Sequence, residues 1–243
     1  MKCYTLISRD QKQESWLMYL PVQKLPQRKR RPELPNVIQS LLGKPPEFRL
    51  EMKAKYVPFC CKQCGRYDPD TMFEQGFNDP VRIKIKGDYD HTNDRIFIVS
   101  DTFLACIVAA QVRGYESKAV GSSGWHALRI TERVDCKSDT IETSGSNCSG
   151  CGLPEEAHGG FCNENEICFP NCSNTLFTTK LHWPRPITDR DILMTEEVAI
   201  ALKAGGIKGG YCDRLRTDAE KTKFWEKSKN GITWTPSGGK VYL

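Results

Sequence analysis

The alternation of hydrophobic and polar positions predicts short strands combined with two similar helices. Residues 95–99 have the pattern of a strand, and Ser100 and Asp101 then supply a hydroxyl cap and an acid in a first helical turn. The apolar face of this segment contains Phe103, Leu104, Ile107 and Val108. We therefore expect a helix over 100–113 that stops at Gly114, followed by strands over 115–120 and 125–134.

The same pattern recurs 95 residues later in the chain. A short apolar run leads to Thr195 and Glu196, which again place a hydroxyl cap and an acid before an amphipathic segment. Without a gap, Gly114 aligns with Gly209, so the second helix is expected over 195–208. We interpret the two segments as related strand-helix units.

Two cysteine motifs recur in the same order, 87 residues apart. They are Cys61-Lys62-Gln63-Cys64-Gly65 and Cys148-Ser149-Gly150-Cys151-Gly152. Two thiols separated by two residues on a tight turn can bind one metal ion together, and a structural zinc ion takes four ligands. The sequence therefore predicts one zinc site that is formed by Cys61, Cys64, Cys148 and Cys151.

Redox pairs and inert buried thiols are the alternative interpretations of these motifs. A thioredoxin-like role requires one CxxC after a strand of a βαβ unit, and no such context is found. A second metal site could be formed by four further groups, although they lack the two-residue spacing of a CxxC motif. These groups are His158, Cys162, Cys168 and Cys172.

Composition indicates a globular chain without membrane segments. Hydrophobic residues make up 39% and charged residues 27% of the 243 positions, and no apolar run is long enough to cross a bilayer. The first ten residues contain charges before any signal-type apolar run, so we expect a cytoplasmic protein. In a reducing compartment, metal binding explains paired cysteines among a total of 12 better than disulfides do.

No catalytic motif is complete. Residues 121–124 are one residue short of the nucleophile elbow GxSxG, and residues 203–210 lack the lysine and hydroxyl of a phosphate-binding loop. His91, His126 and His182 share no motif with a nucleophile, and a four-thiolate zinc leaves no open position for water. We therefore expect no catalytic residues, no organic cofactor and no enzyme activity.

These patterns predict an α+β fold of two related strand-helix units with mixed sheets, tied by a pair of zinc knuckles. The first half, residues 1–134, would hold the first CxxCG and the helix over 100–113. The second half, residues 135–243, would hold the second CxxCG and the helix over 195–208. Because each half carries one knuckle, the metal would join the halves into one compact body.

The two CxxCG motifs and the helix openings at Ser100 and Thr195 resemble the double-CxxCG immunity proteins, a type associated with swarming-inhibition toxins of myxobacteria. The resemblance is carried by Cys61, Cys64, Gly65, Cys148, Cys151 and Gly152. It implies a zinc-binding cytoplasmic protein that neutralises a cognate polymorphic toxin by direct binding. The partner would then be the protein toxin, and a membrane would play no part.

A zinc-ribbon module that binds nucleic acid is the alternative function. The net charge of +5 is concentrated partly in residues 28–31, where Arg28, Lys29, Arg30 and Arg31 form a basic run. Lys53, Lys55, Lys62 and Arg66 lie near the first knuckle. A metal-dependent hydrolase site within residues 158–172 is a third alternative.

Overall fold

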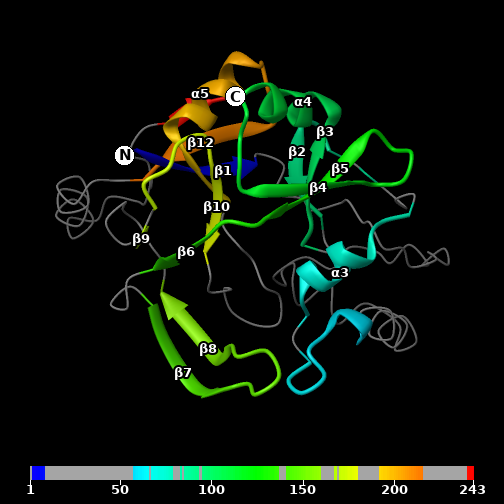
Figure 1. The fold of residues 1–243 in the computed structure, drawn as a ribbon, viewed down its shortest axis with the longest axis vertical. Helices are drawn as coiled ribbons and strands as arrows, with labels where there is room; N and C mark the ends of the chain where they lie inside the picture. The colour runs from blue at the N-terminus through cyan, green and yellow to red at the C-terminus, as the bar shows by residue number, and fades with distance from the viewer. Residues whose placement is uncertain are drawn as a thin grey trace, which may run out of the picture.

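The computed structural model describes residues 2–8, 57–65, 67–78, 83, 85–92, 95–136, 141–159, 167–168, 170–179, 192–215 and 240–243. These residues form two main sheets, a hairpin and a small number of short helices, as expected for an α+β fold (Figure 1). The predicted fold class is therefore confirmed.

The larger sheet has seven strands and is mixed. In spatial order they are β13 (Lys240–Tyr242), β12 (Gly210–Arg214), β1 (Cys3–Ser8), β11 (Ile192–Thr195), β10 (Leu176–Thr179), β6 (Arg133–Cys136) and β9 (Ile167–Cys168). All the pairings are antiparallel except that of β10 with β6.

The smaller sheet has four antiparallel strands: β2 (Tyr89–His91), β3 (Phe97–Ser100), β5 (Trp125–Ile130) and β4 (Tyr115–Ala119). A separate hairpin consists of β7 (Ile141–Asn147) and β8 (Pro154–Gly159). The α-helices are α3 (Pro69–Gln75), α4 (Asp101–Ala109) and α5 (Glu196–Ala204), and Val57–Phe59 form a 3-10 turn.

The two strand-helix units correspond element by element at an offset of 95 residues. This offset maps β3, α4 and β4 onto β11, α5 and β12 with identical bounds. The cap residues Ser100 and Thr195 share nearly the same backbone angles, with φ of −72° and −73° and ψ of 165° and 163°. The similarity predicted from the helix patterns therefore extends to the flanking strands.

Both helices are shorter than expected and end in the same way. In the first unit, Gln111 adopts a φ of 53°, and Val112 donates a hydrogen bond to the carbonyl of Ile107. In the second unit, Gly206 adopts a φ of 67° and Ile207 donates to Leu202. This left-handed closure is a Schellman motif, so the predicted helix ends at residues 113 and 208 were wrong by one turn.

The neighbouring strands continue the symmetry but come from different parts of the chain. β5 pairs with both β3 and β4, and β1 pairs with both β11 and β12 in the same register, so that Trp125 corresponds to Cys3. The second unit is thus completed by the first strand of the chain. The boundary between two halves at residue 134 stays a prediction. The seven-stranded sheet contains strands from both of these halves.

The strand predicted over 125–134 is two strands. β5 ends at Ile130, where Thr131 donates to the carbonyl of Gly114, and β6 then pairs in parallel with β10 of the other sheet. The chain therefore leaves one sheet and enters the other within two residues. The alternation of hydrophobic residues continues from one strand into the next, so it cannot reveal that the chain changes sheets here.

The two units interlock reciprocally. Arg113, which follows α4, forms a bridge with Thr175 of the other unit. Symmetrically, the carbonyl of Lys208, which follows α5, accepts a hydrogen bond of 2.7 Å from the amide of Asp88. The turn after α4 therefore contacts the residue that precedes β10, and the turn after α5 contacts the residue that precedes β2.

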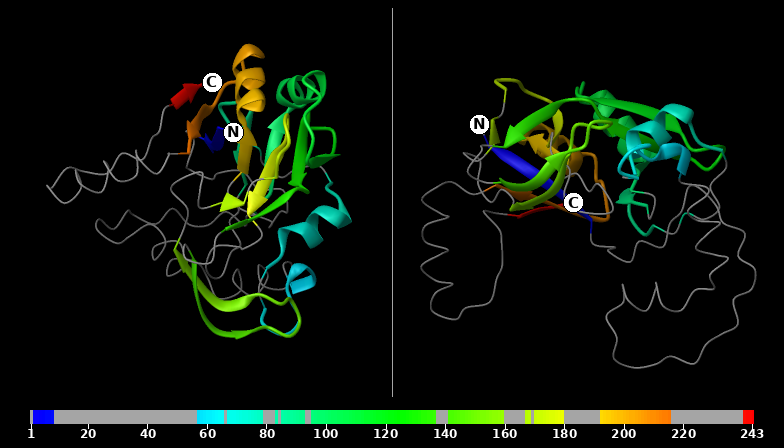
Figure 2. Two further views of the ribbon diagram at one scale, coloured as in Figure 1. Left: turned by 60° about the vertical axis from the view of Figure 1, so that its left-hand side comes forward. Right: turned by 90° about the horizontal axis from the view of Figure 1, so that it is seen from below.

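The helices α4 and α5 lie side by side at the end of the molecule opposite to the β7–β8 hairpin (Figures 1 and 2). The thiol of Cys106 donates to the carbonyl of Ala201 at 3.3 Å. A Cβ on Gly205 would lie 2.5 Å from that sulfur, so the close approach requires a glycine. One continuous core cluster includes residues from both units, among them Phe103, Ile107, Val198 and Leu202.

We predict that Gly114→Ala destabilises the fold far more than Gly206→Ala. Both glycines have a positive φ, 84° and 67° respectively, so both substitutions strain the backbone by about 1–2 kcal/mol. The added Cβ would lie 2.3 Å from the carbonyl oxygen of Leu176 at Gly114, whereas nothing lies within 4 Å at Gly206. Urea unfolding should show an additional loss of about 1–3 kcal/mol for Gly114→Ala. Equal losses in the two variants would contradict the interlocked arrangement.

Candidate metal centre

The first CxxCG forms a tight turn in front of helix α3. Cys60 and Tyr67 form an isolated antiparallel bridge, and the amide of Gly65 donates to the carbonyl of Cys61 at 2.8 Å. Gly65 has a φ of 68°, a conformation that glycine adopts without steric cost. The turn therefore presents the thiols of Cys61 and Cys64 on one side.

The second CxxCG occupies the tip of the β7–β8 hairpin and repeats this geometry at an offset of 87 residues. Asn147 pairs with Pro154, and the amide of Gly152 donates to the carbonyl of Cys148 at 2.7 Å. Gly152 has a φ of 71°. We call each of these two CxxCG turns a knuckle.

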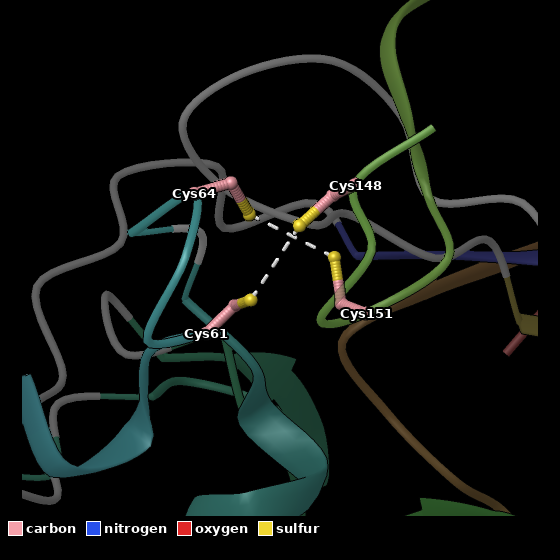
Figure 3. A group of neighbouring side chains, drawn as sticks. All are labelled: Cys61, Cys64, Cys148 and Cys151. Carbon is pink, nitrogen blue, oxygen red and sulfur yellow. Dashed lines mark hydrogen bonds between the residues drawn. The ribbon is translucent and has the colours of Figure 1, made fainter. Parts of the chain in front are cut away.

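The structure brings the four predicted cysteines together. The sulfurs of Cys61 and Cys148 are 3.8 Å apart, and those of Cys64 and Cys151 are 3.7 Å apart (Figure 3). All four sulfurs lie within 4.8 Å of one another, and all four cysteines are free thiols. Figure 3 shows that the side chains converge from the two knuckles. The cluster could therefore hold a metal ion.

Backbone amides lower the pKa of two thiols in the cluster. Hydrogen bonds from the backbone of Cys151 and then Gly150 lower the pKa of Cys148 to about 6. The backbone of Cys64 and then Gln63 lowers the pKa of Cys61 in the same way. By contrast, burial raises the pKa of Cys60, and it raises that of Cys212 to about 12. The knuckle turns therefore favour thiolates, the form that binds metal.

The two knuckles also contact each other away from the sulfurs. The hydroxyl of Ser149 donates to the side-chain oxygen of Gln63. A Cβ on Gly150 would lie 2.9 Å from the sulfur of Cys61 and 3.3 Å from the Gln63 side chain. Sequence reasoning did not identify Gln63, Ser149 and Gly150 as contact residues, because the contact depends on how the knuckles face each other.

Helix α3 fixes the first knuckle to the four-stranded sheet. Lys118 of β4 donates to the carbonyls of Phe73 and Glu74 at 2.9 Å, at the end of α3. Arg129 of β5 binds Glu74 and lies 4.8 Å from the centre of the Phe73 ring. Phe59 and Phe73 are buried in a core cluster of their own, so the knuckle is anchored by packing as well as by charge.

The second knuckle is attached to the other sheet. The β7–β8 hairpin lies in the chain between β6 and β9, which pair with each other at the edge of the seven-stranded sheet. Figure 1 shows this hairpin reaching toward the turn in front of α3. A metal ion in the cluster would therefore join the two sheets.

The remaining sequence candidates lie elsewhere. His126 binds Asp101 at 2.6 Å, and the ring of His91 contacts that of Phe97 in a tilted arrangement, with centroids 5.1 Å apart. Within the described ranges, the four knuckle cysteines are the only group of three or more potential metal ligands. Cys168 and Cys172 belong to no such group, whereas Cys162 and the side chain of His158 lie outside the described residues, so the second metal site stays a prediction.

The basic run at residues 28–31 also lies outside the described residues, as do Lys53, Lys55, Arg66 and His182. Lys62 is described and exposed. In the part of the chain that the structure covers, no helix is long and apolar enough to cross a membrane.

Comparisons with family models, with curated proteins and with solved structures found no match to this chain.

We predict that metal-free protein is alkylated at Cys148 at unusually low pH. The pKa of about 6 means that Cys148 is mostly thiolate at pH 7, and the thiolate is the reactive form. The rate of iodoacetamide labelling, followed by peptide mass spectrometry after chelation, should rise through a midpoint near pH 6. Cys60 serves as an internal control because burial raises its pKa, so its labelling should rise only in alkaline solution. A common midpoint for both thiols would contradict the role of the turn amides.

Proposed function

We propose that Cys61, Cys64, Cys148 and Cys151 bind one structural zinc ion. A Zn–S bond of about 2.3 Å in a regular tetrahedron places neighbouring sulfurs about 3.8 Å apart. The two short S···S distances across the cluster are 3.7 and 3.8 Å. Disulfide-bonded sulfurs would instead lie about 2.0 Å apart.

A four-thiolate set suits a structural rather than a catalytic ion. All four positions of the tetrahedron would be filled by protein sulfurs, which leaves none for water or substrate. The role of the ion would be to hold the β7–β8 hairpin against the turn before α3. Because a metal that binds only the folded state adds its binding free energy to stability, the ion would lock the two units together.

We further propose that this scaffold is an immunity protein that neutralises a cognate polymorphic toxin in the cytoplasm by direct binding, without catalysis. Support comes from the joint arrangement of two equivalent knuckles and two equivalent capped helices, the features by which the chain resembles the double-CxxCG immunity proteins. The observation that carries most weight is the convergence of both knuckles on one cluster. A pre-organised surface loses little entropy on binding, which suits tight inhibition.

The net charge of +5 restricts the mode of inhibition. An acidic decoy that imitates nucleic acid would carry a strong negative charge. If the toxin acts on nucleic acid, this protein would therefore bind a surface of the toxin other than its basic substrate-binding surface.

We predict one zinc ion per chain and a large loss of stability in Cys148→Ser. Elemental analysis of the purified protein should give a zinc-to-protein ratio near one, and the variant should fall well below it. Its melting temperature should drop by about 10 °C or more, because structural zinc contributes strongly to folding. Cys168→Ser is the matched control, since Cys168 is exposed and lies outside the cluster. Equal melting of the two variants, or metal-free protein with wild-type stability, would overturn the zinc proposal.

We predict that co-expression with the product of the neighbouring open reading frame rescues cells from its toxicity and that the two proteins co-purify. Binding to one protein that changes little with salt supports the immunity function. Binding to nucleic acid that weakens steeply with salt, without rescue, would support the zinc-ribbon alternative instead. The Cys148→Ser variant should lose rescue in proportion to its loss of folded protein.

A further inference from the structure

Strand β4 forms one border of the four-stranded sheet. In the described part of the chain the strand order is β2-β3-β5-β4, so β4 has a neighbouring strand only on its β5 side. Its residues Glu116, Ser117 and Ala119 are exposed to solvent. A strand at such a border presents amide and carbonyl groups that can pair with another extended chain.

The internal repeat shows what covers the same edge in the other unit. At the offset of 95 residues β4 corresponds to β12, which has β1 on one side and β13 on the other. Ser117 corresponds to Cys212, which pairs with Val241 of β13 and is fully buried. Of two equivalent strand edges, one is covered by a strand of this chain and, within the described residues, the other is not.

The backbone hydrogen bonds identify which groups of β4 point away from β5. The carbonyl of Gly114 and the amide of Val120 are hydrogen-bonded to the chain at the two ends of β5, both at 2.9 Å. Because hydrogen-bonded pairs alternate along an antiparallel ladder, every second residue between them also bonds to β5. The amides and carbonyls of Tyr115 and Ser117 therefore point to the outer edge.

Strand β13 uses the equivalent groups of β12. The amide of Leu243 donates to the carbonyl of Gly210, the residue that corresponds to Tyr115, at 3.2 Å. Val241 pairs with Cys212, which corresponds to Ser117. The second unit therefore shows that an antiparallel strand fits this edge in a defined register.

The end of α3 closes only the far end of the β4 edge. Phe77, which follows α3, forms a bridge with Val120, and Lys118 donates to two carbonyls at the end of α3. On the equivalent strand, the pairing with β13 reaches no further than Asp213, which corresponds to Lys118. The segment that β13 covers in one unit is thus the segment that α3 leaves accessible in the other.

A second copy of this chain fits the edge poorly. A two-fold axis that pairs Tyr115 with Ser117 of another copy would place the two Glu116 side chains directly opposite each other. Glu116 binds Arg129 but is still 51% exposed, and like charges in opposite positions are destabilising. An axis centred on Ser117 would instead require pairing next to the bridge that Phe77 forms. A strand from a different protein avoids both conflicts.

We propose that β4 binds an extended segment of the protein partner as a fifth, antiparallel strand of this sheet. Tyr115 and Ser117 supply the backbone hydrogen bonds, and the segment carries a basic residue opposite Glu116. Main-chain hydrogen bonds give affinity in strand addition, and the side chains that lie opposite give selectivity. The inference rests on the proposed binding of a toxin and names the surface that performs it.

The test is amide hydrogen exchange at single-residue resolution on the full-length protein, alone and in complex with the product of the neighbouring open reading frame. The amides of Tyr115 and Ser117 should exchange rapidly in the free protein and about tenfold or more slowly in the complex. Those of Glu116 and Lys118 should exchange slowly in both states, because they bond to β5. Only pairing with a strand produces this alternation.

Two results of the exchange experiment would overturn the proposal. Slow exchange of Tyr115 and Ser117 in the free protein would mean that this chain or a second copy already covers the edge. Unchanged exchange of these amides in the complex would mean that the partner binds elsewhere.

A substitution of Ser117 tests the same pairing through affinity. Ser117→Pro removes the outward amide without breaking the β4–β5 ladder, since proline is tolerated on edge strands. It should weaken binding of the product about tenfold. Ser117→Val keeps the amide and is the matched comparison, so it should bind about tenfold more tightly than Ser117→Pro. Equal affinities of the two variants would contradict strand addition.

Zinc content and circular dichroism verify that both variants fold. If Ser117→Pro does not fold, the exchange pattern of the wild-type protein decides. Rescue and co-purification without any change at β4 would refute this surface and leave the immunity function in place. If the wild-type protein binds no such product, both proposals fail.

Discussion

The convergence of four sulfurs from two distant turns is the constraint on which the arrangement of the molecule depends. Each knuckle is a local structure that its own glycine and backbone hydrogen bonds can form. Neither turn alone supplies more than two sulfurs, so the cluster exists only when the two sheets hold the knuckles face to face. Close packing of Gly150 against Cys61 shows how little freedom remains between them.

The internal symmetry explains how two such turns come to face each other. The knuckles and the strands β2 and β10 share an offset of 87 residues, whereas the helices share one of 95. The difference of eight residues falls between β10 and β11, so it leaves the relation between knuckle and strand unchanged. Because the turns after α4 and α5 cross to the opposite unit, neither unit forms this core alone.

The internal repeat is matched at some equivalent positions and differs at others. The cysteine cluster lies between the two knuckles, where backbone amides donate hydrogen bonds to the thiols of Cys61 and Cys148. The equivalent positions His91 on β2 and Thr178 on β10 carry different side chains in the two units. The internal repeat therefore combines a matched pair of CxxCG turns with strand positions that differ between the units.

The sequence alone determined the four cysteines, the capped starts of α4 and α5 and their repetition, because caps, thiol spacing and helical periodicity are local properties. It could not determine that β1 completes the second unit, that residues 125–134 divide between two sheets, or that Gln63 meets Ser149. Those features depend on pairing between strands far apart in the chain, and alternation within one strand does not specify its neighbour. Tertiary structure therefore decided which thiols and polar groups meet, since only folding brings residues 87 positions apart to within hydrogen-bonding distance.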